Sequence, residues 1–233
     1  MLQTRSSLPT VERLTRVPEP ELMSAADQAH AYSEADFDSP HRAFVERFQL
    51  EFPQFAGRSF RALDLGCGPA DVTVRFALAH PSAAVVGIDG ADIMIDLGRA
   101  RVNRFRLTDR VELRHLRLPT TGIEPGHFDA VISNSVLHHL ADPSTLWRTI
   151  VANAAHGAAV FVMDLCRPDH ETIVESLVRR HAGDAPEVLQ HDFAASLRAA
   201  YRPDEIRSQL REVGLCMNVE QTSDRHVVAW GVR

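Results

Sequence analysis

The feature that most restricts how this chain can fold is a glycine turn between an apolar run and a helical pattern, in RALDLGCGPADVTVRFA at residues 61–77. Residues 62–65 predict a short buried strand, and the apolar spacing of residues 71–79 predicts a helix. Gly66 and Gly68 mark the tight turn between them. A strand, a glycine turn and a helix N-terminus make a place where the backbone can approach a nucleotide-like ligand closely.

A second predicted strand, AVVGID at residues 84–89, ends in Asp89. A carboxylate there can accept hydrogen bonds from both hydroxyls of a ribose. Two details differ from a dinucleotide-binding fingerprint, because Asp71 stands where the third glycine would be and Asp64 precedes the turn. Extra carboxylates would repel a pyrophosphate but would not repel a ligand that carries an ammonium and a sulfonium.

Three segments resemble motifs of the class I S-adenosylmethionine-dependent methyltransferases. They are D-x-G-C-G-P at residues 64–69, G-I-D at residues 87–89 and FDAVISNSVLHHLADP at residues 128–143. The three stand in the family's order and spacing, and the resemblance covers roughly residues 59–168. It is to small-molecule members (similar to domain types 11 and 25). It implies an enzyme that uses S-adenosylmethionine to methylate oxygen, nitrogen or carbon of a small-molecule acceptor.

The order of the predicted elements indicates an α/β protein. Strands that alternate with helices favour a parallel sheet covered on both faces, and two closing strands with a short connection must be antiparallel to each other. We therefore expect a Rossmann-like seven-stranded mixed sheet, parallel with one antiparallel strand. The expected organisation is a flexible tail at 1–20, an N-terminal helical lid at 21–58, and a methyltransferase domain at 59–233. This domain would carry a helical insertion at about 168–203.

Composition limits the number of domains, the partners and the mechanisms that we expect. The chain has 233 residues, which suits one sizeable domain, and its net charge of -6 argues against a nucleic-acid partner. Scattered cysteines and the lack of a long apolar stretch predict a cytoplasmic protein without a membrane partner. All 25 basic residues are arginine, which excludes mechanisms that need a lysine. The oligomeric state stays open.

The resemblance also implies a cofactor site. Gly66 and Gly68 would hold the amino-acid end of S-adenosylmethionine, Asp89 its ribose and Asp64 its ammonium. Relatives commonly have an aspartate after the third strand for the adenine; this chain has none, so the backbone near Leu116 is expected instead. The full set of expected cofactor-binding residues is Asp64, Gly66, Gly68, Asp89, Gly90, Met94, Leu116, Asn134 and Tyr32. For Met94 and Tyr32, packing in the core is the alternative.

The predicted catalytic residues follow the next strand along the chain. His138 and His139 are candidate general bases, because histidine titrates near neutral pH and both lie in a helix expected to begin at Ser135. Helix capping and packing is the alternative for this pair. Asp164, at the end of a later strand, could orient or deprotonate the acceptor, or bond the next helix. A base is needed only if the acceptor arrives protonated.

Other sites and classes are less favoured. His226, with Asp224 and Arg225, lies between the last two strands, where relatives form part of the acceptor pocket. The remaining histidines lack partners four residues away, so no metal site is expected. A nucleic-acid methyltransferase would need a basic surface or a base-flipping loop. A nicotinamide-dependent oxidoreductase conflicts with the acids around the turn, and a binding protein without turnover stays open.

Overall fold

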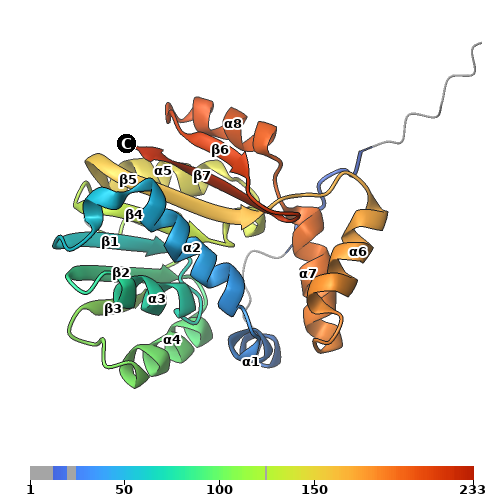
Figure 1. The fold of residues 1–233 in the computed structure, drawn as a ribbon, viewed down its shortest axis with the longest axis horizontal. Coiled ribbons are helices and arrows are strands. Elements are labelled where there is room, and N and C mark those ends of the chain that lie inside the picture. The colour runs from blue at the N-terminus through green and yellow to red at the C-terminus, as the bar shows by residue number, and fades with distance from the viewer. Residues whose placement is uncertain (1–12, 20–24, 124) are drawn as a thin grey trace, which may run out of the picture.

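Strands and helices alternate around one seven-stranded sheet, in the order β3-β2-β1-β4-β5-β7-β6 (Figure 1). The computed structural model describes residues 13–19, 25–123 and 125–233. The strands are β1 Phe60–Leu65, β2 Ala83–Asp89, β3 Val111–His115, β4 Phe128–Asn134, β5 Ala154–Leu165, β6 Asn218–Gln221 and β7 His226–Val232. The helices are α1 Ala26–Glu34, α2 Asp38–Glu51, α3 Asp71–Ala79, α4 Asp92–Arg104, α5 Ser144–Asn153, α6 Glu171–Ala182, α7 Glu187–Ala199 and α8 Pro203–Glu212. None of these described helices combines the length and apolar character needed to cross a membrane.

The strand directions confirm the predicted mixed sheet. Strands β1 to β5 pair in parallel, whereas β7 runs antiparallel to both β5 and β6. All the carboxyl ends of the parallel strands therefore meet at one edge, which faces α1 and the α6–α7 pair in Figure 1. Ligands of open α/β sheets bind outside this edge.

Helices cover both faces of the sheet. Helices α2, α3 and α4 pack on one face, where Phe44 and Phe48 meet the sheet residue Phe161. Helices α5 and α8 pack on the other face around Trp147 and Leu210. Side chains of a strand alternate between the two cores because successive residues point to opposite faces. Helices thus cover both faces of the sheet, and a ligand site is expected at its uncovered carboxyl edge.

The two helices of the expected N-terminal lid, α1 and α2, have different surroundings. Helix α2 is part of the layer on the sheet, since Phe44 and Phe48 are fully buried there. Helix α1 instead touches α4 and α7, with Ala29 and Tyr32 packed near Met94. Helix α2 is therefore packed as part of the layer on the sheet, whereas α1 lies against α4 and α7, and the role of residues 21–58 as a lid stays a prediction.

Part of the predicted tail has defined contacts. Residues 13–19, which we call the N-terminal strap, run past the α6–α7 pair. The Leu14 N–H donates to the Asp169 carbonyl and the Val17 N–H donates to the Arg198 carbonyl. The rest of the predicted tail, residues 1–12 and 20, lies outside the described residues. The strap brings Glu19 to the edge where the parallel strands end.

Candidate active site

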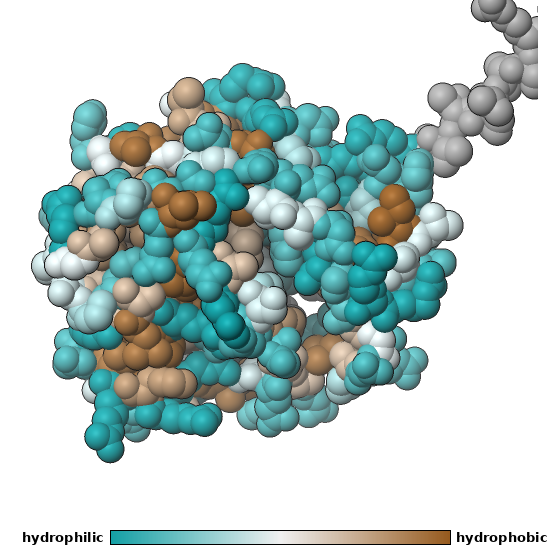
Figure 2. All heavy atoms as spheres, viewed as in Figure 1, coloured by the Kyte–Doolittle hydropathy of each residue, from teal (hydrophilic) through white to brown (hydrophobic). Residues whose placement is uncertain are grey.

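A cavity of about 790 Å³ opens at the carboxyl edge of the sheet. Figure 2 shows the molecule hollowed between the α6–α7 pair and the rest of the chain. All of the expected cofactor-binding residues line this cavity: Asp64, Gly66, Gly68, Asp89, Gly90, Met94, Leu116, Asn134 and Tyr32. His138 and His139 line it as well, whereas Asp164 does not. The structure therefore brings the predicted residues together, and their individual roles stay predictions.

The glycine turn has the backbone geometry that only glycine adopts easily. Gly66 has φ +72°, and an added Cβ would meet a Val136 methyl group at 2.2 Å. Gly68 has φ +51°, and an added Cβ there would meet no protein atom within 4 Å. Gly66 is thus required by the protein's own packing, while Gly68 leaves open space beside the backbone. A ligand can approach the turn closely at Gly68.

Asp89 ties the turn to the second strand. One carboxylate oxygen accepts a hydrogen bond from the Gly68 N–H at 2.9 Å, and the other accepts from the Ala91 N–H at 2.9 Å. Burial raises the pKa of Asp89 despite these bonds. Because a carboxylate oxygen has further acceptor capacity, both oxygens can still accept a ribose hydroxyl. Asp89 is held in place for that contact.

Asp64 lies deep beneath the turn and is 1% exposed. One oxygen accepts a hydrogen bond from the Thr73 hydroxyl at 2.6 Å. Burial, with the nearby Asp89 charge, raises the pKa of Asp64 to about 7. An adjacent ammonium group would favour the ionised form. The predicted role of Asp64 is therefore consistent with a cationic ligand.

Asn134 offers a direct test of whether the expected cofactor fits. Its side-chain nitrogen donates to the Ser135 hydroxyl, but its Oδ1 is buried without any hydrogen-bond partner among the described residues. Such orphaned acceptors are costly unless a ligand or water donates to them. An ammonium group at the amino-acid end of S-adenosylmethionine would supply that donor. The open space at Gly68 and the acceptors at Asn134 and Asp89 thus fit this cofactor.

The side of the cavity expected to face adenine is apolar. Met94 packs in one cluster with Tyr32 and Ala91. The Leu116 N–H already donates to the Asp89 carbonyl. An adenine amino group donates hydrogen bonds, so it would meet the carbonyl oxygen of Leu116. Desolvation raises the pKa of Tyr32 to about 12, with help from the Asp71 and Asp89 charges. Tyr32 therefore stays neutral and acts by packing or by its hydroxyl.

His138 sits between two carboxylates. Its Nδ1 bonds the Asp164 carboxylate, and its Nε2 lies 3.3 Å from a Glu19 oxygen. Burial opposes the charged ring, but the two carboxylates outweigh burial and raise the pKa of His138. Asp164 also accepts from the Leu137 N–H at 2.7 Å, and not from the helix that follows it. His138 is 2% exposed, so packing accounts for much of its surroundings.

The predicted helix from Ser135 is wrong in extent, since only Leu137–His139 form a short 3₁₀ turn. Ser135 has φ +57°, which breaks regular helix. The turn leaves His139 more exposed than His138, with its Nδ1 3.2 Å from Glu19. Ligand atoms of these two histidines and Glu19 lie within 4.8 Å of one another. The absence of a metal stays a prediction.

The opposite wall of the cavity comes mainly from α7. It is lined by Leu189, Asp192, Phe193 and Ser196, together with Leu165, Arg225 and His226. Asp192 accepts a hydrogen bond from Gln28 at 2.8 Å, which joins α7 to α1. Burial and the Arg225 charge lower the pKa of His226 to about 4. This wall could orient an acceptor through apolar contacts and a few polar groups.

Several lining or adjacent residues were not singled out from the sequence. His41 lies within a helical phenylalanine stripe, where a single histidine gives no functional signal. Glu19 falls in a segment that has no periodicity. The α7 residues lie in the predicted helical insertion, but no motif distinguishes them. Only the placement of the elements reveals these residues.

Comparison with known proteins identifies a domain family. Residues 63–160 match the family described as methyltransferase domain. A trans-aconitate 2-methyltransferase of Methylobacterium radiotolerans is 31% identical over 152 residues, which cover 63% of this chain and 51% of that protein. A ubiquinone biosynthesis O-methyltransferase of Methylococcus capsulatus is 26% identical over 200 residues, covering 84% of this chain and 80% of that protein.

Solved structures give the same fold. The plantazolicin methyltransferase in complex with S-adenosylhomocysteine has a TM-score of 0.66 at 13% identity, covering 89% of this chain and 90% of that chain. At this identity the likeness shows the fold alone. The chain spans about half of the first curated relative and about a quarter of each of the next two.

Proposed function

We propose that this chain transfers a methyl group from S-adenosylmethionine to oxygen, nitrogen or carbon of a small-molecule acceptor. The match of residues 63–160 to the methyltransferase domain family and the similarity to a trans-aconitate 2-methyltransferase support this proposal. The observation that carries the proposal is the single cavity with two unlike walls. One wall has the glycine turn, Asp89 and the orphaned acceptor of Asn134. The other wall, from α7, offers space for an acceptor.

The chain's own part in the reaction is to hold two molecules in line. S-adenosylmethionine supplies a methyl carbon already activated by a positively charged sulfur. Much of the rate can then come from keeping the attacking atom about 3 Å from that carbon, with water excluded. Helices α1 and α7 both line the cavity and are joined through Gln28 and Asp192, which would help to hold the two molecules between them.

If the acceptor arrives protonated, the two histidines differ in what they can do. Both ring nitrogens of His138 face carboxylates, so His138 is poorly placed to take a further proton. We assign to it the positioning of the 3₁₀ turn, together with Asp164. His139 is more exposed and lines the cavity, and we assign the proton-accepting role to it.

The proposal is tested by titration calorimetry with S-adenosylhomocysteine and with NAD. We expect binding of the first and none of the second. Asp89→Asn should weaken S-adenosylhomocysteine by about 1–3 kcal/mol through lost charge-assisted hydrogen bonds. Asp96→Asn, on the exposed side of α4, is the matched control and should bind normally. Binding of NAD alone would contradict the proposal.

Turnover requires a second assay. Radiolabelled methyl transfer should first be tried with trans-aconitate and with hydroxylated ubiquinone precursors, the acceptor classes that the relatives' names suggest. Transfer to a hydroxyl acceptor, which must lose a proton, should fall in His139→Ala, whereas transfer to an ionised carboxylate should not. Cofactor binding without transfer to any acceptor in a broad metabolite screen would instead favour a binding protein without turnover.

A further inference from the structure

His41 is a buried histidine, and one of its two ring nitrogens forms a hydrogen bond within the protein. It belongs to α2, is 6% exposed and lines the cavity. Its Nδ1 bonds an Asp71 oxygen at 2.6 Å. Burial works against the Asp71 charge, but the bonds from His41 and Arg75 outweigh burial and lower the pKa of Asp71. Since the ionised carboxylate only accepts, Nδ1 carries a proton and donates.

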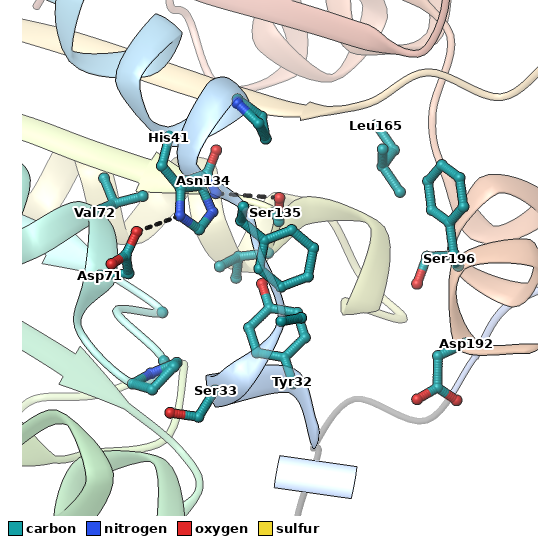
Figure 3. A pocket seen from close by; sticks show the side chains of 18 of the residues that line it. Tyr32, Ser33, His41, Asp71, Val72, Asn134, Ser135, Leu165, Asp192 and Ser196 are labelled. Atoms are coloured by element: carbon teal, nitrogen blue, oxygen red, sulfur yellow. Dashed lines mark hydrogen bonds and ion pairs between the residues drawn. The ribbon is translucent and has the colours of Figure 1, made fainter. Parts of the chain in front are cut away.

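The other ring nitrogen, Nε2, has no hydrogen-bond partner among the described residues. It is not among the enclosed unpartnered polar atoms, so it is accessible from the cavity that His41 lines. Figure 3 shows His41 and Asp71 on one side of the cavity, with Leu165, Ser196 and Asp192 on the other. Nε2 therefore belongs to the half that contains the glycine turn, away from the α7 wall.

The glycine turn itself has no backbone donors to spare at its start. The Gly66 and Cys67 N–H groups both donate to the Ile88 carbonyl, at 2.8 and 2.9 Å. The Gly68 N–H donates to Asp89. A ligand carboxylate beside this turn must therefore find other donors. Helix α3, which begins at Asp71, has no side-chain cap, so its N-terminus adds a positive dipole end at the same place.

The unpartnered groups in this half have complementary character. Asn134 Oδ1 is an acceptor that lacks a donor, which suits an ammonium. A doubly protonated imidazole at His41 would donate to a carboxylate through Nε2 while Nδ1 still donates to Asp71. Its positive charge would be balanced by Asp71 on one side and by the ligand carboxylate on the other. The guanidinium groups of Arg75 and Arg101 also pair with Asp71, so its negative charge is shared among several cations.

We propose that His41 binds the carboxylate of the methyl donor's amino-acid part through Nε2, with Asp71 fixing the orientation of the ring. His41 thereby selects a nucleoside with an amino-acid tail over the same nucleoside without a carboxylate. This inference rests on the proposed function, since it concerns the donor half of the same cavity.

The test compares two ligands that differ only in the carboxylate, S-adenosylhomocysteine and its decarboxylated analogue. His41→Asn keeps a nitrogen near Asp71 but removes the outer nitrogen. We expect this variant to lose about tenfold or more in affinity for S-adenosylhomocysteine, as for a hydrogen bond to a charged group. Its affinity for the decarboxylated analogue should stay within twofold of the unaltered protein. His30→Asn, on the exposed side of α1, is the control and should change neither affinity.

The outcomes separate this inference from the proposed function. An equal loss for both ligands would overturn the role of His41 in carboxylate recognition, as would normal affinity for both. His41→Gln, which offers a neutral amide donor near the outer nitrogen, should restore part of the discrimination. Failure of the unaltered protein to bind S-adenosylhomocysteine at all would overturn the proposed function, and this inference with it.

Discussion

At the scale of single residues, Gly66 and Gly68 have the same backbone restriction but different surroundings. Both have positive φ, which costs about 1–2 kcal/mol for a residue with a Cβ. Only at Gly66 would the added carbon also clash, with Val136. Gly66→Ala should therefore destabilise the fold by clearly more than 2 kcal/mol, measured by urea unfolding. Gly68→Ala should cost only the backbone strain.

The second half of this prediction concerns binding. A carbon added at Gly68 would stand in the open space beside the turn, so Gly68→Ala should weaken S-adenosylhomocysteine while the protein stays folded. Calorimetry measures the affinity and circular dichroism checks the fold. Equal destabilisation by the two substitutions would show that packing around Val136 relaxes freely.

The residues that could be predicted are those whose chemistry depends on local sequence. Asp89 and the two glycines could be placed because a strand end, a turn and a helix start are all written in one short segment. His41 and Glu19 could not, since each reaches the site through packing of an element far away in sequence. A motif predicts the local backbone conformation. It does not predict which side chains a helix far away in the sequence places at the site.

At the scale of elements, the N-terminal strap depends on charge at His138. A histidine whose pKa is raised on folding adds stability that is complete below its unfolded pKa of about 6.5 and is lost as pH rises through the folded value. Burial opposes the raised pKa of His138, whereas Asp164 and then Glu19 support it, and of the two carboxylates only Glu19 belongs to the strap. The pairing of charged His138 with Glu19 therefore favours the docked strap at low pH. Burial raises the pKa of Glu19, which acts in the same direction.

We expect hydrogen exchange at the Val17 amide to quicken as pH rises above neutral, after correction for the intrinsic exchange rate. The expected result is a progressive loss of protection as pH rises, because the charged form of His138 is lost. Glu19→Gln removes the pairing charge and should abolish this pH dependence. The Val74 amide inside α3 is the internal reference. Unchanged protection of Val17 across this range would contradict the electrostatic account.

Element boundaries could be predicted where turn chemistry is explicit and not elsewhere. Helix α3 spans Asp71–Ala79, as predicted from the glycine turn before it and from its apolar spacing. The segment after β4 was predicted as a helix because its apolar pattern is compatible with one, yet Ser135 adopts positive φ and Asp164 holds the Leu137 N–H. A tertiary contact therefore determines the conformation of this turn, and the local sequence pattern does not predict that contact.

At the scale of the whole molecule, the fold class follows from the alternation of strands and helices, because parallel strands need crossovers. The position of the α6–α7 pair does not, since nothing in its sequence says which edge it covers. Its contact with α1 is made by Gln28 and Asp192. This contact joins the two helices on either side of the cavity at the sheet edge.

We expect S-adenosylhomocysteine to slow amide exchange in both α1 and α7, although only α1 would lie over the donor half. Gln28→Ala should keep the protection of α1 and remove most of that in α7, because the hydrogen bond at 2.8 Å couples them. Exchange measured by mass spectrometry resolves both helices. Gln54→Ala, exposed before β1, serves as the control. Protection of α7 that persists without Gln28 would place the coupling elsewhere.

Helix α1 touches both the helix beside the donor half, α4, and the helix of the acceptor half, α7. The donor half and the acceptor half of the cavity therefore lie beside the same helix. If the chain turns over as proposed, the demethylated nucleoside and the methylated product would both leave past α1, and movement of this nine-residue helix would then limit the rate of release.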